Sequence, residues 1–160
     1  MAGEFLTWFD APSPESDEHV ASVENAIGYR LPDDYREFAK SYSGGSPHET
    51  DFEFSDSETG TFCASVGEFF TLSPDDDRNL LRWMERTEFF PTGLVPFAGD
   101  GGGNYICFDF RSDTNSPSIV FWHSGRRGLE NEVSCVAKTF SDFVDLLHEP
   151  ADEEDTTPAP

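Results

Sequence analysis

The stretch PFAGDGGGNYICFDFR, residues 96–111, decides how this chain is to be interpreted, because four of its glycines fall within five residues. A phosphate-binding loop needs a strand, a glycine loop and then a helix whose N-terminus faces the anion. Here no GK[ST] follows, and the residues after Gly103 have the pattern of a strand. We therefore predict a tight turn between two strands, in which glycine supplies positive φ. Bare backbone in such a turn also lets another group approach closely.

Runs rich in β-branched and aromatic residues continue on both sides of this turn. They are separated by Gly, Asn, Ser and Pro, which is typical of consecutive antiparallel strands. We predict such strands over residues 94–98, 104–110, 118–124 and 132–137. Upstream, the alternating segments DFEFS and GTFCAS predict a hairpin, and VGEFF, residues 66–70, is interpreted as a single helical turn.

Helical patterns stand at both ends of the chain and once in the middle. Ser13 as N-cap, Pro14 in the first turn and Gly28 at the end bound the first helix. The remaining helices are expected within LPDDYREFAKSYSGG (31–45), SPDDDRNLLRWMERTEFF (73–90) and TFSDFVDLLHE (139–149). The third begins at Ser73 in this interpretation, so that the acids after it face the positive end of the helix dipole. Helices at both ends with strands between them indicate an α+β fold with a central, mostly antiparallel sheet.

The length of 160 residues fits one domain, which we assign to residues 1–148. Sixteen phenylalanines predict a core rich in that residue, because each buried aromatic removes about 150–250 Å² from water. Residues 149–160 contain acids and prolines but no large apolar side chain. We expect this acidic tail to be disordered, since it cannot offset the entropy cost of ordering.

The net charge is −22, from 32 acidic and 10 basic residues. A domain this acidic repels nucleic acid and anionic membranes and attracts basic partners. Solubility alone is the simpler explanation of the charge, and the sequence leaves both open.

The three cysteines, Cys63, Cys107 and Cys135, are widely spaced and include no CxxC pair. We expect no metal site, and interpret them as buried free thiols of a cytoplasmic protein. Neither SPDDDRNLL nor DGGGN has the ligand spacing of an EF-hand. The N-terminus lacks the features of a signal peptide, and no run of about 18 apolar residues occurs.

Catalysis has no recognisable motif in this chain. The four histidines are scattered, and none lies in a G-x-S-x-G or H-E-x-x-H frame. Residues distant in sequence can still meet in space, so a triad is not excluded by spacing alone. We expect a non-enzymatic protein without a cofactor.

Four segments in a fixed order resemble one family. They are VENAIGYRLPDDYREFAKSYSGG (23–45), LVPFAGDGGGNYICFDF (94–110), SIVFWHS (118–124) and VAKTFSDFVDLL (136–147). Together they resemble the SUKH superfamily of Smi/Knr-like immunity proteins. Ser43 departs from the asparagine that this family prefers before the double glycine, and RRGLEN, residues 126–131, looks like an insertion.

The resemblance implies an α+β domain that binds and neutralises a toxin, often a nuclease, without catalysis. The alternative is a regulatory interaction scaffold of the kind found among eukaryotic relatives. A basic nuclease partner would suit the charge, because carboxylates can mimic the phosphates of its substrate. We expect a monomer. The expected partner-binding residues are the turn and strand residues Asp100, Asn104, Asp109, Trp122 and His123 and the acidic patch Asp75, Asp76 and Asp77.

Six of these eight residues have a structural alternative. Asp100 and Asn104 are also suited to capping the turn, and Trp122 to packing in the core. The three acids at 75–77 are equally suited to the N-terminus of a helix.

Overall fold

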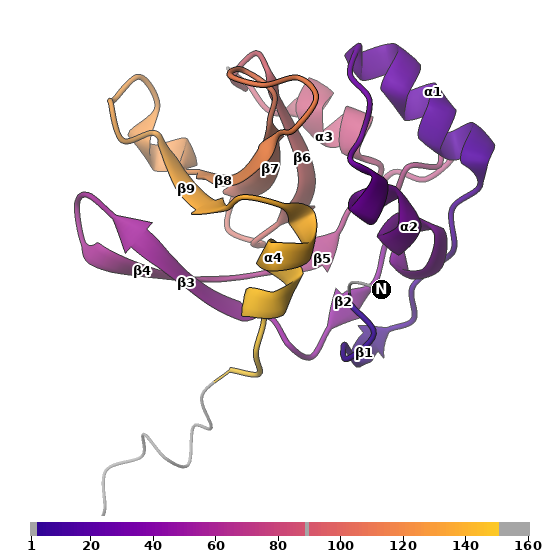
Figure 1. The fold of residues 1–160 in the computed structure, drawn as a ribbon, viewed down its shortest axis with the longest axis horizontal. Coiled ribbons are helices and arrows are strands. Elements are labelled where there is room, and N and C mark those ends of the chain that lie inside the picture. The colour runs from indigo at the N-terminus through magenta and orange to yellow at the C-terminus, as the bar shows by residue number, and fades with distance from the viewer. Residues whose placement is uncertain (1–2, 89, 151–160) are drawn as a thin grey trace, which may run out of the picture.

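A five-stranded antiparallel sheet forms the centre of the molecule in the computed structural model, which describes residues 3–88 and 90–150. Its strands follow the chain in the order β5–β6–β7–β8–β9 (Figure 1). Their bounds are β5 Glu68–Phe69, β6 Leu94–Gly99, β7 Tyr105–Asp109, β8 Ser118–Trp122 and β9 Val133–Ala137. The predicted α+β fold with a mostly antiparallel sheet is therefore confirmed.

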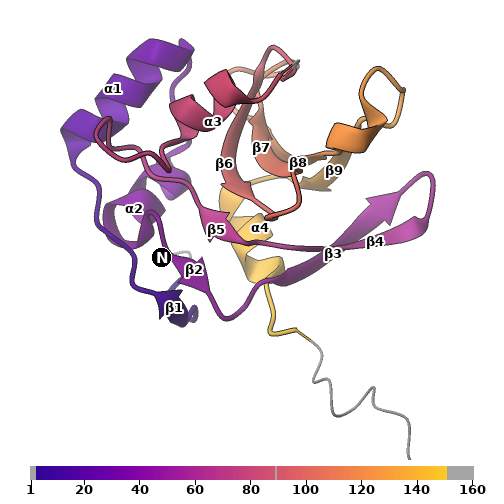
Figure 2. The same ribbon diagram turned by 180° about the vertical axis from the view of Figure 1, so that it is seen from behind.

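Two smaller antiparallel sheets lie beside the central one. The first joins β1 (Trp8–Asp10) to β2 (Ser46–Pro47), and the second is the hairpin of β3 (Asp51–Asp56) and β4 (Gly60–Ser65). The β3–β4 hairpin extends past β9, as Figures 1 and 2 both show. Hairpin and sheet share a buried aromatic contact, since the rings of Phe54 and Phe121 lie 5.3 Å apart.

Four α-helices in the described residues surround the sheet. They are α1 (Asp17–Ile27), α2 (Asp33–Tyr42), α3 (Leu80–Arg86) and α4 (Phe140–Leu146), and a short 3-10 helix, η1 (Ser124–Arg126), lies between β8 and β9. Helix α4, yellow in Figure 1, follows β9 directly. The hydroxyl of Thr139 accepts a hydrogen bond from the Asp142 amide, which confirms the predicted N-cap of this helix.

The starts of two helices were predicted too early. Helix α1 begins at Asp17, because Ser16 rather than Ser13 provides the cap and accepts a hydrogen bond from the His19 amide. Helix α3 begins at Leu80 rather than near Ser73, because the Asn79 side chain caps it.

The interpretation of VGEFF as a helical turn was wrong. Glu68 and Phe69 form the edge strand β5, in which Phe69 pairs with Ala98 of β6.

The prediction that all three thiols are buried was also wrong. Cys107 is buried, but Cys63 and Cys135 are exposed, because each lies on a strand whose successive side chains alternate between two environments.

The core occupies both faces of the central sheet, and phenylalanine dominates it as predicted. On one face the rings of Phe97 and Phe108 lie 4.7 Å apart, and Tyr35 of α2 and Phe140 of α4 pack against them. On the other face Tyr105 contacts the rings of Phe70, Trp83, Phe90 and Trp122. Aromatic pairs at such distances contribute about 0.5–1.5 kcal/mol each beyond the area they bury.

The described helices are short and amphipathic. None of them has the length and apolar character needed to cross a bilayer.

The expected acidic tail falls at residues 149–160, of which 151–160 lie outside the described residues.

Candidate functional site

The glycine run forms the turn between β6 and β7, as predicted. Gly101 and Gly103 have φ angles of 81° and 98°, in the left-handed region that favours glycine. The Asp100 carboxylate accepts hydrogen bonds from the amides of Gly102 at 2.7 Å and Asn104 at 3.0 Å. The side-chain amide of Asn104 donates to the other Asp100 oxygen at 2.8 Å. Asp100 and Asn104 therefore hold the turn in shape.

Asn104 also ties the turn to the next loop. Its side-chain oxygen accepts hydrogen bonds from the Ser124 amide at 3.0 Å and the Ser124 hydroxyl at 3.2 Å. Ser124 begins η1, which follows β8. The turn is thus fixed at both ends, while Gly101, Gly102 and Gly103 between them are exposed.

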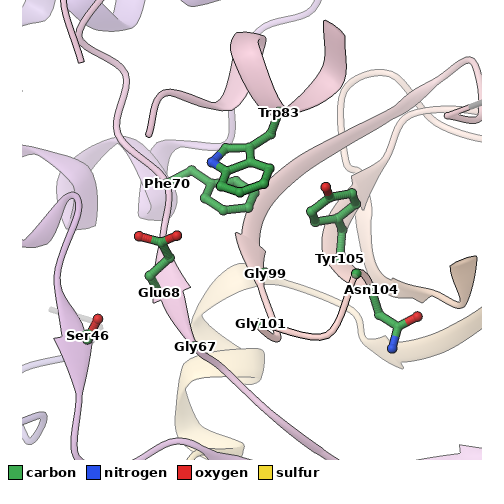
Figure 3. A pocket seen from close by; sticks show the side chains of 10 residues that line it. Ser46, Gly67, Glu68, Phe70, Trp83, Gly99, Gly101, Asn104 and Tyr105 are labelled. Carbon is green, nitrogen blue, oxygen red and sulfur yellow. The ribbon is translucent and has the colours of Figure 1, made fainter. Parts of the chain in front are cut away.

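A pocket of about 280 Å³ lies beside this turn. Figure 3 shows its aromatic wall of Trp83 and Phe70, with Tyr105 on one side of this pair and Glu68 on the other. We call it the glycine-turn pocket. Its lining consists of Ser46, Gly67, Glu68, Phe70, Trp83, Gly99, Gly101, Gly103, Asn104 and Tyr105.

The aromatic wall of the glycine-turn pocket is rigid. Phe70 and Trp83 are stacked with ring centroids 5.2 Å apart, and Tyr105 meets Phe70 edge-on at 5.9 Å. The hydroxyls of Tyr105 and Thr87 are hydrogen-bonded at 2.8 Å. Thr87 in turn donates to the Trp83 carbonyl at 2.7 Å, so α3 and β7 are held together above the pocket.

Two glycines in the lining of the pocket allow close approach of neighbouring segments. The Gly67 amide donates to the Gly99 carbonyl at 2.7 Å. A Cβ atom on Gly67 would lie 3.2 Å from that carbonyl oxygen, and one on Gly99 would lie 3.0 Å from the Phe70 ring. Neither position accepts a side chain without movement of its neighbours, so bare backbone is retained along this wall.

Asp109, at the end of β7, is engaged by its neighbour. The Arg111 guanidinium donates to both Asp109 oxygens, at 2.9 Å and 3.0 Å. Partial burial opposes ionisation of Asp109, but the hydrogen bonds and the charge of Arg111 outweigh it and hold the pKa of this carboxyl below its usual value. Asp109 thus remains ionised, paired at the opposite end of β7 from the glycine-turn pocket.

Trp122 and His123 lie inside the molecule, which is at odds with their predicted contact with a partner. Their exposed fractions are 2% and 4%. The Trp122 ring stacks on Tyr105 at 5.8 Å, and its indole nitrogen donates to Glu132 at 2.9 Å. Trp122 therefore supports the wall of the glycine-turn pocket from behind.

His123 belongs to a buried cluster that joins the β3–β4 hairpin to β8 and β9. Arg126 donates to both oxygens of Asp56, at 2.7 Å and 3.1 Å. These hydrogen bonds hold the pKa of Asp56 well below its usual value. Burial, aided by the charge of Arg126, lowers the pKa of His123. The imidazole is therefore neutral near pH 7.

The same cluster brings a serine, a histidine and an aspartate together. His123 Nε2 lies 2.8 Å from the Ser134 hydroxyl, and Asp56 lies 4.0 Å from that same nitrogen. In a catalytic triad the aspartate orients the other ring nitrogen and the histidine takes the serine proton. Here Asp56 approaches the same ring nitrogen as Ser134 does, and the Asp56 oxygen also lies 3.2 Å from the Ser134 hydroxyl. The aspartate therefore does not have the position of the orienting aspartate of a triad, and the cluster joins the hairpin to the sheet.

The acids at 75–77 lie in the turn before α3, not in its first helical turn. Asp76 accepts hydrogen bonds from the Arg78 amide and guanidinium, and these outweigh partial burial and lower the pKa of Asp76. Asp75 and Asp77 are exposed, and Asp77 lies 3.5 Å from Arg82. The expected helix-terminal role is therefore wrong, and the acidic patch stays a prediction for partner binding.

No group of three or more histidine, cysteine, aspartate or glutamate side chains in the described ranges has the geometry of a metal site. The lining of the glycine-turn pocket combines aromatic rings, glycine backbone and one carboxylate.

Comparison with known proteins identifies the family. The family model described as the SMI1 / KNR4 family (SUKH-1) matches residues 14–146, and the chain belongs to this family. It is also similar to the SPbeta prophage-derived uncharacterized protein YokK of Bacillus subtilis (strain 168). The two are 28% identical over 162 residues, which cover 90% of this chain and 82% of that protein.

Sequence reasoning found the turn but missed the side chains that complete its pocket. Phe70 and Trp83 have the spacing of core residues, and Glu68 was placed in a helical turn. The signal that was available is the glycine at Gly67, two residues before the paired Phe69, since glycine in a strand region often marks close backbone approach.

Proposed function

We propose that this protein is an immunity protein that neutralises a basic toxin by stoichiometric binding. The observation that carries the proposal is the net charge of −22 on a domain of the SMI1 / KNR4 family (SUKH-1). The similar protein YokK of Bacillus subtilis is described as SPbeta prophage-derived. The toxin acts in the cytoplasm, and the immunity protein meets it there.

A nuclease is the toxin class that fits the charge. A nuclease binds a polyanion, so its cleft is basic. Exposed carboxylates such as those of Asp75 and Asp77 would occupy the positions of phosphates in that cleft. Opposite fields also speed association, toward about 10⁸–10⁹ M⁻¹s⁻¹ at low salt.

The mode of action is binding without catalysis. The Ser134–His123–Asp56 cluster is closed to a substrate, since the three residues are buried. The protein acts as one monomer on one toxin domain.

The test is direct binding to the toxin domains encoded beside this gene. Each is immobilised in a catalytically inactive form, and association is measured by interferometry at about 50 mM and 300 mM salt. We expect a tight complex of one-to-one stoichiometry whose association slows strongly as salt is added. The Debye length is about 10 Å at 0.1 M salt and becomes shorter at higher concentrations, so the attraction between the two proteins is screened. Nuclease activity of the active toxin should fall to background at equimolar protein.

The double variant Asp75→Asn/Asp77→Asn tests whether the acidic patch faces the toxin. These two carboxylates are exposed, so their removal leaves the fold intact and should slow association if the acidic patch faces the toxin. Binding to no adjacent product would reject the immunity function in favour of a regulatory scaffold. Binding whose rate is independent of salt would reject the electrostatic part of the proposal.

A further inference from the structure

Strand β4 forms one edge of the two-stranded β3–β4 hairpin. In an antiparallel pair, residues that bond across the pair alternate with residues that direct their backbone groups outward. The Val66 amide donates to the Thr50 carbonyl at 2.8 Å, and this bond fixes the alternation for the hairpin. Along the register from that pair, the residues of β4 whose backbone groups point outward are Thr61, Cys63 and Ser65.

The opposite edge of the hairpin follows the same alternation and is engaged by the protein itself. Asp51 of β3 lies across the hairpin from Ser65. Its backbone groups point away from β4 and exchange hydrogen bonds of 2.9 Å and 3.0 Å with His148. Further along β3, the Asp56 side chain lies 3.2 Å from the Ser134 hydroxyl of β9. The hairpin therefore turns its β3 edge toward the rest of the domain.

The outward backbone groups of β4 are available. Within residues 3–88 and 90–150, no hydrogen bond engages the amides of Thr61, Cys63 and Ser65 or the carbonyls of Cys63 and Ser65. The Thr61 carbonyl accepts one bond, from the Thr59 hydroxyl at 3.2 Å. All three outward residues are exposed. An added strand would thus find three donors and two acceptors in alternate positions.

The sequence of β4 lacks the features by which proteins protect an edge strand. Natural edges are blunted by lysine, proline, bulges or very short strands. Strand β4 has six residues, GTFCAS, none of them charged or proline, and it pairs with β3 in a continuous register. The edge strand β5, in contrast, has only two residues. An open edge of this length suits strand addition, in which main-chain hydrogen bonds supply the affinity.

The charge of the protein selects the kind of strand that can add. The net charge of −22 repels a second copy of the chain and attracts a basic segment. Strand β4 contains no lysine or arginine that would oppose such a segment. The main chain of β4 and the field of the domain therefore favour the same occupant, an extended segment that carries positive charge.

We propose that β4 binds an extended segment of the basic partner protein, which adds to the β3–β4 hairpin as a third strand. The backbones of Thr61, Cys63 and Ser65 form the hydrogen bonds, and lysine or arginine side chains on the added strand meet the negative field. This inference deepens the proposed function and rests on it for the identity of the partner. The capacity of β4 to accept a basic strand is tested without any toxin.

The first test measures amide hydrogen exchange in the free, isotope-labelled protein by NMR. The amides of Phe62 and Ala64 bond to β3, so they should exchange at least about tenfold more slowly than those of Thr61, Cys63 and Ser65. Protection of these three amides in the free protein would overturn the proposal. If that protection rises with protein concentration, a second copy occupies the edge; if it does not, the chain covers its own edge.

The second test titrates a synthetic peptide of nine residues, in which two lysines flank each side of five alternating threonines and valines. We expect saturable shifts at the amides of Thr61, Cys63 and Ser65. One matched peptide has glutamate in place of lysine, and another keeps the lysines but has five central prolines, which lack N–H donors. Both should bind at least about tenfold more weakly. Equal binding of either peptide, or no saturable shift at β4, would overturn the proposal.

Variants at one position separate the main chain from the side chain. Cys63→Pro removes an outward N–H and leaves the bonds to β3 in place, since proline is tolerated where the N–H of an edge strand faces solvent. It should weaken peptide binding at least about tenfold. Cys63→Ser keeps the N–H and should retain binding, because the proposal assigns no role to the thiol. Equal weakening in both variants would overturn the proposal. Circular dichroism checks folding, and the exchange measurement needs no variant.

The last test uses the toxin domain captured by the binding experiment above. In the complex, the amides of Thr61, Cys63 and Ser65 should gain at least about tenfold protection, and Cys63→Pro should weaken the complex at least about tenfold. If the toxin binds without that protection, or binds Cys63→Pro as it binds the wild type, the β4 proposal is overturned and the immunity function stands. If the wild type binds no toxin, the immunity function fails, and the peptide titration alone decides whether β4 accepts a strand.

Discussion

Replacing Glu15 with alanine should destabilise the fold strongly, because this carboxylate is buried and joins three segments. It lies just before α1 with an exposed fraction of 7%. One oxygen accepts hydrogen bonds from the Ser43 hydroxyl at 2.7 Å and the Leu72 amide at 3.0 Å, and the other lies 2.7 Å from His19. Ser43 follows α2 and Leu72 follows Phe70, so Glu15 also fixes the segment that forms the pocket's aromatic wall.

The magnitude follows from the two buried donors. A hydrogen bond to a charged group contributes about 1.5–3 kcal/mol net, so loss of the bonds from Ser43 and Leu72 should cost about 3–6 kcal/mol. The contact with His19 is left out of this sum, because the His19 side chain is 35% exposed and water can replace its hydrogen bond to Glu15. Glu15→Gln keeps an acceptor oxygen for both donors and should cost about 1–2 kcal/mol.

The assay is urea denaturation followed by circular dichroism. With a slope near 2 kcal/mol/M, within the typical range, Glu15→Ala should lower the midpoint by about 1.5–3 M. Glu37→Ala, at an exposed position of α2, is the control and should stay within about 0.5 kcal/mol of the wild type. An unfolding free energy for Glu15→Ala equal to that of the control would refute the reasoning.

Three further predictions concern the turn, the thiols and a histidine. Asp100→Ala removes three hydrogen bonds within the glycine turn and should lower the unfolding free energy by about 1–2 kcal/mol; an unchanged urea midpoint would contradict the capping role. Ellman's reagent should label two thiols in the native protein and Cys107 only on unfolding, because burial raises the pKa of that thiol; immediate labelling of all three would show that the core is open. The hydrogen bond to Glu53 raises the pKa of His148 above 6.5, so its stabilising contribution is complete below pH 6.5 and disappears as the pH rises through the folded-state pKa. NMR titration should show that raised pKa and its return toward 6.5 in Glu53→Gln, and an ordinary pKa in the wild type would count against the contact.

Elements whose signals are local were predictable from the sequence. Val20 and Val23 repeat at helical spacing and are buried in α1, and Gly28 ends that helix with φ 80°. The glycine turn was predictable for the same reason, since the need for positive φ at Gly101 and Gly103 is a property of the residues themselves.

Elements that depend on distant partners were not predictable in this way. Glu68 and Phe69 form a strand because β6 offers its edge to them, and no local pattern records that pairing. The start of α3 was placed at Ser73, but Asn79 caps this helix. The Asn79 side chain also donates a hydrogen bond to the Ser73 carbonyl, and this contact exists only once the turn over residues 73–79 has folded.

The candidate site was predictable only in part. The turn residues Asp100 and Asn104 were identified from the sequence, but the glycine-turn pocket combines β2, β5, α3, β6 and β7. Residues as far apart as Ser46 and Tyr105 meet there. Such a site appears only once the topology is known, because its members share no spacing along the chain.

The cluster of Ser134, His123 and Asp56 has a consequence for how active sites are recognised by resemblance. A search template defined by residue types and proximity would match this trio to a hydrolase. A template that also includes the neighbouring cation would reject it, since Arg126 occupies both oxygens of Asp56. The residue types of a nucleophilic centre can therefore also form a structural cluster that joins two segments. The neighbouring residue, here Arg126, distinguishes the structural cluster from the catalytic one.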